Sequence, residues 1–248
     1  MKLQPSASVS KKYLNIDVSE IESLIRPFSF IKQEFEPLYV ELNSKNGNLK
    51  KMLIRDLKLD ECSKLLKLIR NRYLNANDFD EVKDFYDIVG ARVYAELLSW
   101  YRKRVKDPYN FVGICNGDLI AYANGRLLNE NINISLHTIA FEQGYRAGAV
   151  LYYVKCYYCF ECLHQKEFWS TFESYYGWQN WGLRMALPSY PWPDYQHELG
   201  GSRIFCLTSE YWHQYVKSYL SEMYGITLIK KVPSEILEKN SSFNISII

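Results

Sequence analysis

The predicted fold is decided by one stretch of sequence, Gln143-Gly144-Tyr145-Arg146-Ala147-Gly148-Ala149, which joins two segments of different periodicity. Before it, Ile132, Ile134 and Leu136 alternate with polar residues, which is typical of a strand. After it, residues 149–163 are strongly apolar and long enough for a buried helix. The stretch therefore predicts a strand-to-helix turn that carries two glycines.

A helix that begins at such a turn can bind an anion. The first N–H groups of a helix have no partner within it, and the peptide dipoles add partial positive charge there. Gly144 and Gly148 let the backbone approach a pyrophosphate closely, and Arg146 can add charge to it. The pattern indicates a phosphate-binding turn, and glycines that merely shape the turn are the alternative.

The segments around this turn predict further strands and helices. Asn-Gly pairs at 46–47 and 116–117 predict two β-hairpins, which join 38–42 to 51–55 and 111–115 to 119–123. Later strands are expected at 168–172, 204–208 and 226–229. Helices are expected at 16–25, after Asp60, over 79–105 and over 211–224.

From residue 49 to residue 212 the predicted order is strand, two helices, hairpin, long strand, glycine-bearing turn, helix, strand, irregular helix and strand. In this order and in the turn, the chain resembles the GCN5-related N-acetyltransferase (GNAT) superfamily. The resemblance implies an α/β (α+β) fold of the acyl-CoA N-acyltransferase kind, with a mixed, mostly antiparallel central sheet flanked by helices. It divides the chain into an N-terminal extension (1–48), a core (49–212) and a C-terminal helix and strand packed on that core (213–248).

The family's turn reads Gln/Arg-x-x-Gly-x-Gly/Ala, and the sequence fits this pattern in two ways. With Gln143 first and Gly148 last, Arg146 replaces the middle glycine. With Gly148 in the middle, the first position becomes Tyr145 and the last becomes Val150. The sequence leaves both alignments open.

The resemblance implies direct transfer of an acyl group, expected to be acetyl, from a CoA thioester to an amine. Acetyl-CoA or another acyl-CoA is the expected co-substrate, and the strand at 135–143 is expected to splay from its neighbour and leave backbone groups for the pantetheine arm. The expected cofactor-binding residues are Ile139, Phe141, Gln143, Gly144, Tyr145, Arg146, Ala147, Gly148 and Ala149.

Direct transfer needs a base for the amine and an acid for the leaving thiolate. Glu142 and His137 are the candidate bases nearest the turn, and a satisfied core histidine is the alternative for His137. The position of the family's acid, a tyrosine, falls on Gly182. Four other tyrosines can substitute, of which Tyr190 is kept as the catalytic candidate: Tyr175, Tyr176, Tyr190 and Tyr195. The missing acid favours the alternative of a non-catalytic CoA-binding or protein-interaction module.

Residues 187–201 form the most unusual segment, because three prolines stiffen a run of aromatic and ionisable side chains. Six of its residues are candidates for substrate contact: Tyr190, Trp192, Asp194, Tyr195, His197 and Glu198. Asp194, His197 and Glu198 are also alternative bases. A packed surface loop is the structural alternative.

Cys156, Cys159 and Cys162 have a spacing that can hold zinc or an iron–sulfur cluster. On a continuous helix, however, three such thiols fan over a broad face and cannot converge on one metal. We therefore expect core thiols and no metal site.

Composition limits the classes of partner. The 30 basic and 28 acidic residues give a net charge of +2, which does not favour nucleic-acid binding. No segment approaches the roughly 20 apolar residues of a membrane span, and the start of the chain lacks the apolar run of a signal peptide. We expect a cytoplasmic protein with reduced cysteines that acts on a small-molecule or peptide amine, without nucleic acid or membrane. A homodimer is left open.

Overall fold

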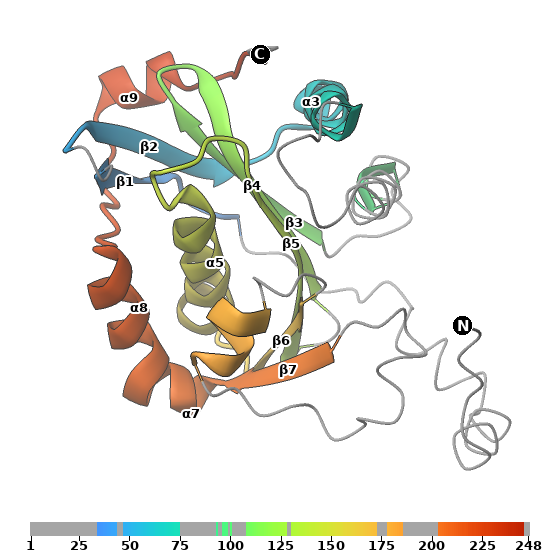
Figure 1. Cartoon of the computed structure of the whole chain (residues 1–248), viewed down its shortest axis with the longest axis vertical. Helices are drawn as coiled ribbons and strands as arrows, with labels where there is room; N and C mark the ends of the chain where they lie inside the picture. The colour runs from blue at the N-terminus through green and yellow to red at the C-terminus, as the bar shows by residue number, and fades with distance from the viewer. Residues whose placement is uncertain are drawn as a thin grey trace, which may run out of the picture.

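The computed structural model describes residues 34–43, 47–74, 93, 96–98, 100, 108–127, 130–172, 178–185 and 203–245. These residues form one sheet with helices on both of its faces (Figure 1). The helix predicted at 16–25 lies outside the described residues, as does most of the helix predicted at 79–105. The residues of that second helix that are described, 93, 96–98 and 100, are helical.

The sheet has seven strands, which lie side by side in chain order. Five neighbouring pairs are antiparallel, and β5 and β6 are parallel. This arrangement confirms the mixed, mostly antiparallel sheet predicted from the sequence. The strands are β1 (Leu38–Asn43), β2 (Leu49–Asp56), β3 (Pro108–Cys115), β4 (Asp118–Leu127), β5 (Ile132–Ala140), β6 (Glu167–Phe172) and β7 (Arg203–Thr208).

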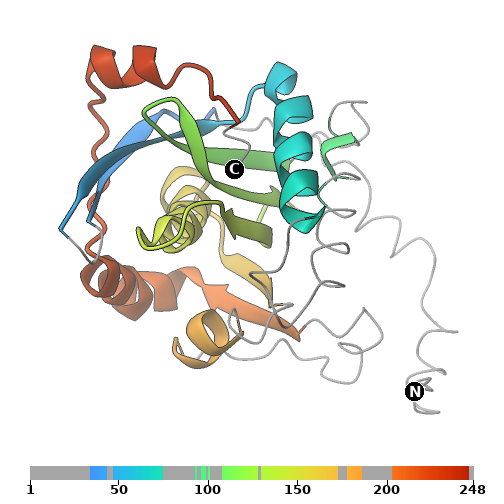
Figure 2. The same cartoon turned by 45° about the horizontal axis from the view of Figure 1, so that its top comes forward.

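Helices cover the two faces of the sheet unequally. One face carries the short helix η1 (Leu59–Glu61), helix α3 (Cys62–Leu74) and the helical residues 93, 96–98 and 100, and we call it the α3 face. The opposite face carries α5 (Ala147–Tyr157), which continues into the π-helical turn η3 (Tyr158–Cys162), and we call it the α5 face. Figures 1 and 2 show α3 and α5 on opposite sides of the strands.

The remaining helices follow β6 and β7. They are η4 (Trp178–Leu183), the continuous run of α7 (Ser209–Tyr211), η6 (Trp212–Val216) and α8 (Lys217–Tyr224), and finally α9 (Ser234–Lys239). The run from 209 to 224 confirms the helix predicted at 211–224. The short helix α9 was not predicted, because six residues are too few for a helical period to emerge.

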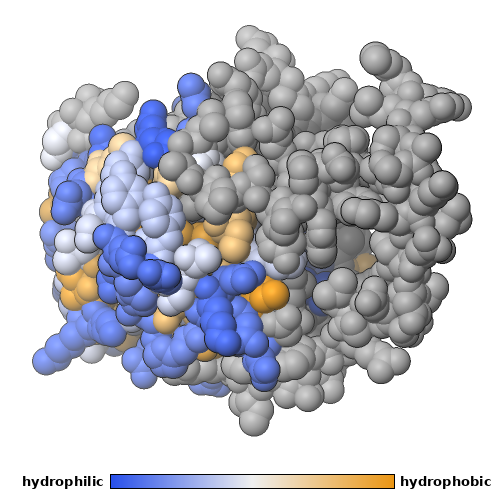
Figure 3. Space-filling view, turned by 90° about the horizontal axis from the view of Figure 1, so that it is seen from below, coloured by the Kyte–Doolittle hydropathy of each residue, from blue (hydrophilic) through white to orange (hydrophobic). Residues whose placement is uncertain are grey.

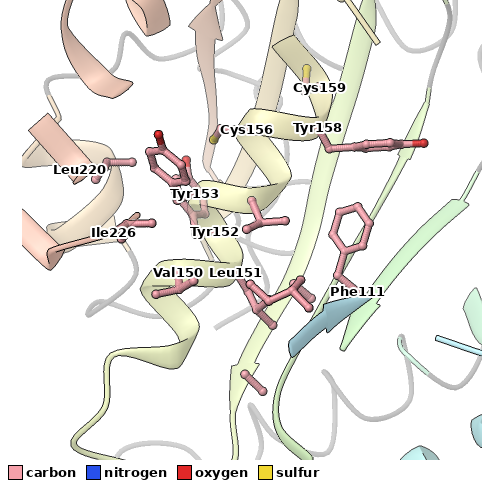
Figure 4. Packing of buried hydrophobic residues seen from close by; sticks show 14 of the residues in the cluster. Phe111, Val150, Leu151, Tyr152, Tyr153, Cys156, Tyr158, Cys159, Leu220 and Ile226 are labelled. Carbon is pink, nitrogen blue, oxygen red and sulfur yellow. The ribbon is translucent and has the colours of Figure 1, made fainter. Parts of the chain in front are cut away.

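The core on the α5 face is built around α5 (Figure 4). Tyr153 lies toward Leu220 of α8, while Tyr158 of η3 lies toward the sheet, with its ring centroid 5.3 Å from that of Phe111 on β3. Cys156 and Cys159 are completely buried in the same cluster, as expected for core thiols. A second cluster fills the α3 face, where it joins the helices on that face to the sheet. Its members include Leu65, Ile69, Val93, Leu97, Val112, Tyr122 and Phe141.

One turn of the sheet was predicted correctly, and one predicted strand was not found. Asn116 and Gly117 both have positive φ, 54° and 85°, and make the tight β3–β4 turn that the Asn-Gly pair predicts. The strand predicted at 226–229 is wrong, because of these residues only Ile229 pairs with the sheet. Its N–H donates to the Tyr39 carbonyl at 2.9 Å and its carbonyl accepts from Tyr39 at 3.0 Å.

The surface is mixed in character. On the side shown in Figure 3, the described residues are mostly hydrophilic, and hydrophobic ones form small separate patches. Among the described residues, no helix has the length and apolar character needed to cross a bilayer.

We expect Gly125→Ala to destabilise the fold by about 1–3 kcal/mol, the usual cost of forced overpacking. A Cβ atom on Gly125 would overlap the Tyr109 hydroxyl and the carbonyl oxygen of Ile134 in the neighbouring strand. Tyr109 cannot move away freely, because its hydroxyl donates to Asn133 Oδ1 at 2.8 Å. Urea denaturation measures the change, with Gly148→Ala as the control, since that Cβ meets only ordinary contacts. Equal stability of the two variants would contradict the prediction.

Candidate functional site

The strands β5 and β6 separate partway along their length. They pair in parallel from Ile132 with Glu167 to Ser135 with Ser170, and among the described residues their pairing ends there. Strand β5 continues to Ala140 along β4 alone. We call this place, where β5 leaves β6, the fork. Beyond it, the edge of β5 that would face β6 pairs with no other described strand.

A β-bulge lies in β5 just beyond the fork. Ala123 of β4 is opposite Thr138, and Gly125 is opposite Ser135, so β5 holds one more residue than β4 over this interval. In a regular strand, residues two apart point to the same face. Ser135 contacts α5, whereas His137 contacts the helical segment of the α3 face. The bulge therefore places these two side chains on opposite faces of the sheet.

On the α3 face, His137 belongs to a small polar group. Its Nε2 atom lies 3.4 Å from Oε1 of Glu96, and its backbone N–H donates to Asn124 Oδ1 at 2.9 Å. The Asn124 side-chain amide in turn donates to the second oxygen of Glu96. His137 is only 8% exposed, while the Glu96 side chain is 25% exposed, so the pair reaches from the sheet interior to the surface.

On the α5 face, Lys155 occupies the space beneath the bulge. Its side chain is fully buried, and its Nζ donates to Ser135 Oγ at 2.5 Å. The same Nζ contacts the carbonyl oxygens of His137 at 3.3 Å and of Asn124 at 3.4 Å. Burial lowers the pKa of Lys155 to about 7, despite the raising influence of Cys156 and Glu96.

Helix α5 also contacts the other strand of the fork. The hydroxyl of Tyr152 lies 3.2 Å from Oγ of Ser170, the last residue of β6 that pairs with β5. The ring of Tyr152 stacks on Trp181 of η4, with centroids 4.6 Å apart. Lys155 and Tyr152 thus connect α5 to the two serines at the fork, one on each strand.

The predicted turn leads from the end of β5 into α5. Gly144 and Arg146 have positive φ, 87° and 60°, and Arg146 is the N-cap residue of α5. Positive φ is the conformation that glycine adopts most readily. Arg146 therefore holds a backbone conformation at the start of α5 that is uncommon for a residue with a side chain.

The N-terminus of α5 is available to an anion. Among the described residues, the side chain of the N-cap Arg146 makes no capping bond, and the N–H groups of Ala147, Gly148 and Ala149 have no acceptor in the helix. A Cβ on Gly148 would lie 3.5 Å from the Ala140 Cβ and 3.9 Å from Cγ2 of Thr138. The helix start therefore lies directly beside the unpaired part of β5, and packing alone does not require a glycine there.

Two predicted site residues at or beside the turn, Arg146 and Glu142, bind other parts of the protein. The Arg146 guanidinium donates to the Met223 carbonyl at 3.2 Å and lies 5.8 Å from the Tyr224 ring, at the end of α8. Glu142 forms a 2.5 Å ion pair with Lys50 of β2. Burial alone would lower the pKa of Lys50, but its hydrogen bond to Glu142 and the charge of that carboxylate raise it. In this structure neither side chain points to the fork.

Two of the predicted cofactor-binding residues pack in the core of the α3 face. Phe141 is buried in the α3-face cluster, and Ile139 is packed against the same cluster. The proposed substrate segment lies outside the described residues, with all of its candidates: Tyr190, Trp192, Asp194, Tyr195, His197 and Glu198. Tyr175 and Tyr176 lie outside them as well.

The cysteines of α5 and η3 are not arranged as ligands. Burial raises the pKa of the Cys156 and Cys159 thiols, which keeps them protonated. Within the part of the chain that the structure describes, no group of three His, Cys, Asp or Glu side chains could hold a metal ion.

Glu96 and Lys155 were not predicted as parts of the site. Glu96 meets His137 only through the packing of distant segments, which no local pattern reveals. Lys155 did carry a signal, because it is a charged residue inside the apolar run at 149–163. A lysine is rarely buried without a specific reason.

Comparison with solved structures finds similarity to GNAT acetyltransferases. The apo structure of FdhC, a nucleotide-linked sugar GNAT, is 12% identical, covers 75% of this chain and 97% of its own, and has a TM-score of 0.49. PaiA N-acetyltransferase from Thermoplasma acidophilum in complex with coenzyme A is 10% identical, with 62% and 97% covered and a TM-score of 0.46. Mycobacterium smegmatis RimJ in complex with CoA-disulfide is 9% identical, with 77% and 95% covered and a TM-score of 0.46.

No protein-family model matches the sequence, and no curated protein matches it. With TM-scores under 0.5, the solved structures carry nothing about substrate or catalysis. Within the described part of the chain, the mixed sheet has one parallel pair, around α5 and the glycine-bearing turn, which is the arrangement of an acyl-CoA N-acyltransferase-like fold.

We expect the stability of the protein, relative to Lys155→Met, to rise with pH. In the folded chain Lys155 loses its proton near pH 7, whereas an unfolded lysine keeps it to about 10.5. The cost of burying the ammonium is thus present in full below pH 7 and is relieved between 7 and 10.5. The difference should grow by on the order of 1 kcal/mol per pH unit in that window. Urea denaturation of both proteins at pH 6 and pH 9 measures it, and a constant difference would contradict it.

Proposed function

We propose that this chain is an acyl-CoA-dependent N-acyltransferase that moves an acyl group, expected to be acetyl, to the amine of a small molecule or peptide. The observation that carries the proposal is the position of the uncapped α5 N-terminus beside the unpaired part of β5. The start of α5 offers N–H groups and partial positive charge. The neighbouring edge of β5 offers backbone groups that pair with no other described strand.

These two features fit the two ends of an acyl-CoA. Its pyrophosphate is an anion that the N–H groups of Ala147, Gly148 and Ala149 can bind. Its pantetheine arm contains amides, which can hydrogen-bond to the edge of β5 beyond Ser135 as an added strand would. The thioester would then lie close to the fork and the bulge.

His137 is the proposed base, and Glu96 is the residue that orients it. A base must reach the attacking amine and have a pKa near the working pH. The bulge directs His137 to the α3 face, and the Glu96 carboxylate, 3.4 Å from its Nε2, favours one ring orientation. Glu142 is the weaker candidate, because its carboxylate is paired with Lys50.

A non-catalytic CoA-binding module remains the second candidate, and Gly182 is the observation that favours it. This glycine is buried within η4 at the position of the family's acid tyrosine, so η4 offers no phenol there. The two candidates agree on acyl-CoA binding and differ on turnover, so binding and catalysis need separate tests.

We expect acetyl-CoA to raise the melting temperature of the wild-type protein. A ligand that binds only the folded state stabilises it by about 2.7 kcal/mol at a hundredfold excess over its dissociation constant. Gly148→Trp should abolish the shift, because the indole would fill the space between α5 and β5. Gly148→Ala is the matched control for folding. No shift in the wild type at millimolar acetyl-CoA would refute the proposed function.

For catalysis, we expect His137→Gln to lower kcat by about 10²- to 10⁴-fold, the usual contribution of a general base. The thermal shift with acetyl-CoA should persist, because the variant leaves the turn and the edge of β5 intact. His213→Gln is the control, since His213 is 49% exposed on η6. Turnover is measured against a panel of small-molecule and peptide amines. If every amine fails with the wild type while the shift persists, the non-catalytic module is the better description.

A further inference from the structure

Lys155 is the one feature of α5 that helix packing does not explain. It is fully buried in a helix whose other inward-facing residues are largely apolar or aromatic. Its Nζ reaches the residue before the bulge (Ser135), a residue in the bulge (His137) and the residue opposite (Asn124). The ammonium group is thus bonded to both strands at this bulge, β4 and β5.

We propose that Lys155 is a positioning residue that clamps the bulge of β5, and so holds His137 on the α3 face and the free edge of β5 at the fork. This inference rests on the proposed acyl transfer, and it adds a residue on which that site depends. Lys155 acts through the strand, without touching the acyl group itself.

The need for a clamp follows from strand geometry. A shift of one residue in register moves each side chain to the other face of the sheet. If the extra residue of the bulge moved along β5, His137 would turn away from Glu96 and toward α5. Lys155 opposes such a shift, because its Nζ holds Ser135, on one side of the extra residue, and Asn124 on β4.

The cost of burying Lys155 supports a functional role. An apolar side chain of similar length would fill the same volume without the penalty of burying a charge. Burial lowers the pKa of Lys155 to about 7, which shows that the site tolerates the ammonium poorly. Buried ionisable groups with strongly shifted pKa values are enriched at functional sites.

The clamp should weaken as Lys155 loses its proton. The contacts to the two carbonyl oxygens are long, 3.3 and 3.4 Å, so they depend on the attraction between a charge and a dipole. The groups that face Lys155 are Tyr152 and Cys156 on its own helix, Glu96 from the α3 face, and the polar atoms of β4 and β5. Of these, ionised Glu96 favours the charged form of Lys155.

The test measures acetyl-CoA binding by titration calorimetry at pH 6 and pH 9, with wild type, Lys155→Met and Lys166→Met. We expect the wild type to bind about tenfold or more weakly at pH 9, as the loss of hydrogen bonds to a charged group implies. Lys155→Met should bind acetyl-CoA weakly at both pH values, and its affinity should not fall further between pH 6 and pH 9 through loss of the Lys155 charge. Lys166 is exposed, so its variant should match the wild type. Ionisation of the phosphates of CoA affects all three proteins equally.

Kinetics give a second readout. Lys155→Met should lower kcat by about tenfold or more, with a smaller change in the KM for the amine. As Lys155 loses its proton above pH 7, the kcat of the wild type should fall relative to the kcat of this variant. Ser135→Ala, which removes the shortest contact of Lys155, should change binding in the same direction to a smaller extent. It provides the test if Lys155→Met does not fold.

Two outcomes separate this inference from the proposed function. If the wild type binds acetyl-CoA, and both Lys155→Met and Ser135→Ala bind it with the same affinity and pH dependence, the clamp is refuted while the proposed function stands. If the wild type binds no acetyl-CoA at either pH, the proposed function is refuted first.

Discussion

The parallel pairing of β5 with β6 is the constraint on which the rest of the site depends. Antiparallel strands can be joined by a two-residue turn, but parallel strands need a crossover, and α5 supplies it here. A crossover helix must begin at the far end of the first strand and return along the sheet. The N-terminus of α5 therefore lies beside residues 138–140, where β5 has already left β6. The place of the α5 N-terminus and, among the described residues, the strand edge without a partner both follow from this one connection.

The fork also collects polar groups that would be costly anywhere else in the core. Lys155, Asn124 and Ser135 are each at most 3% exposed, and they lie between two apolar clusters. Such a network stabilises the fold only while its members are paired, because an unpaired polar group in a low-dielectric interior costs more than a hydrogen bond returns. The contacts to the bulge satisfy these groups, so the bulge and the buried polar residues require each other.

The sequence predicted those features of the fold that depend on neighbouring residues alone, such as turns. Asn116-Gly117 specifies its turn through the conformational freedom of two residues, and the glycine-bearing segment at 143–149 marks the change from strand to helix. The contact between Glu96 and His137 joins distant segments and depends on a bulge, whose position the alternation of Ile132, Ile134 and Leu136 does not reveal. The segment at 226–229 looked like a strand because it is apolar and β-branched, yet only Ile229 meets the edge of the sheet.

The bulge finally explains how β5 can direct His137 to the α3 face and still line the start of α5 on the other face. Direct acyl transfer requires that the amine approach the acyl carbon from a different side than the one the leaving thiolate occupies. A regular β5 would direct Ser135 and His137 to the same face, crowding the proposed base against α5. The extra residue sends His137 to the α3 face beside Glu96, while Thr138 and Ala140 still lie under the start of α5. One inserted residue thus separates the side that would receive the amine from the side that would hold the cofactor, along a single stretch of chain.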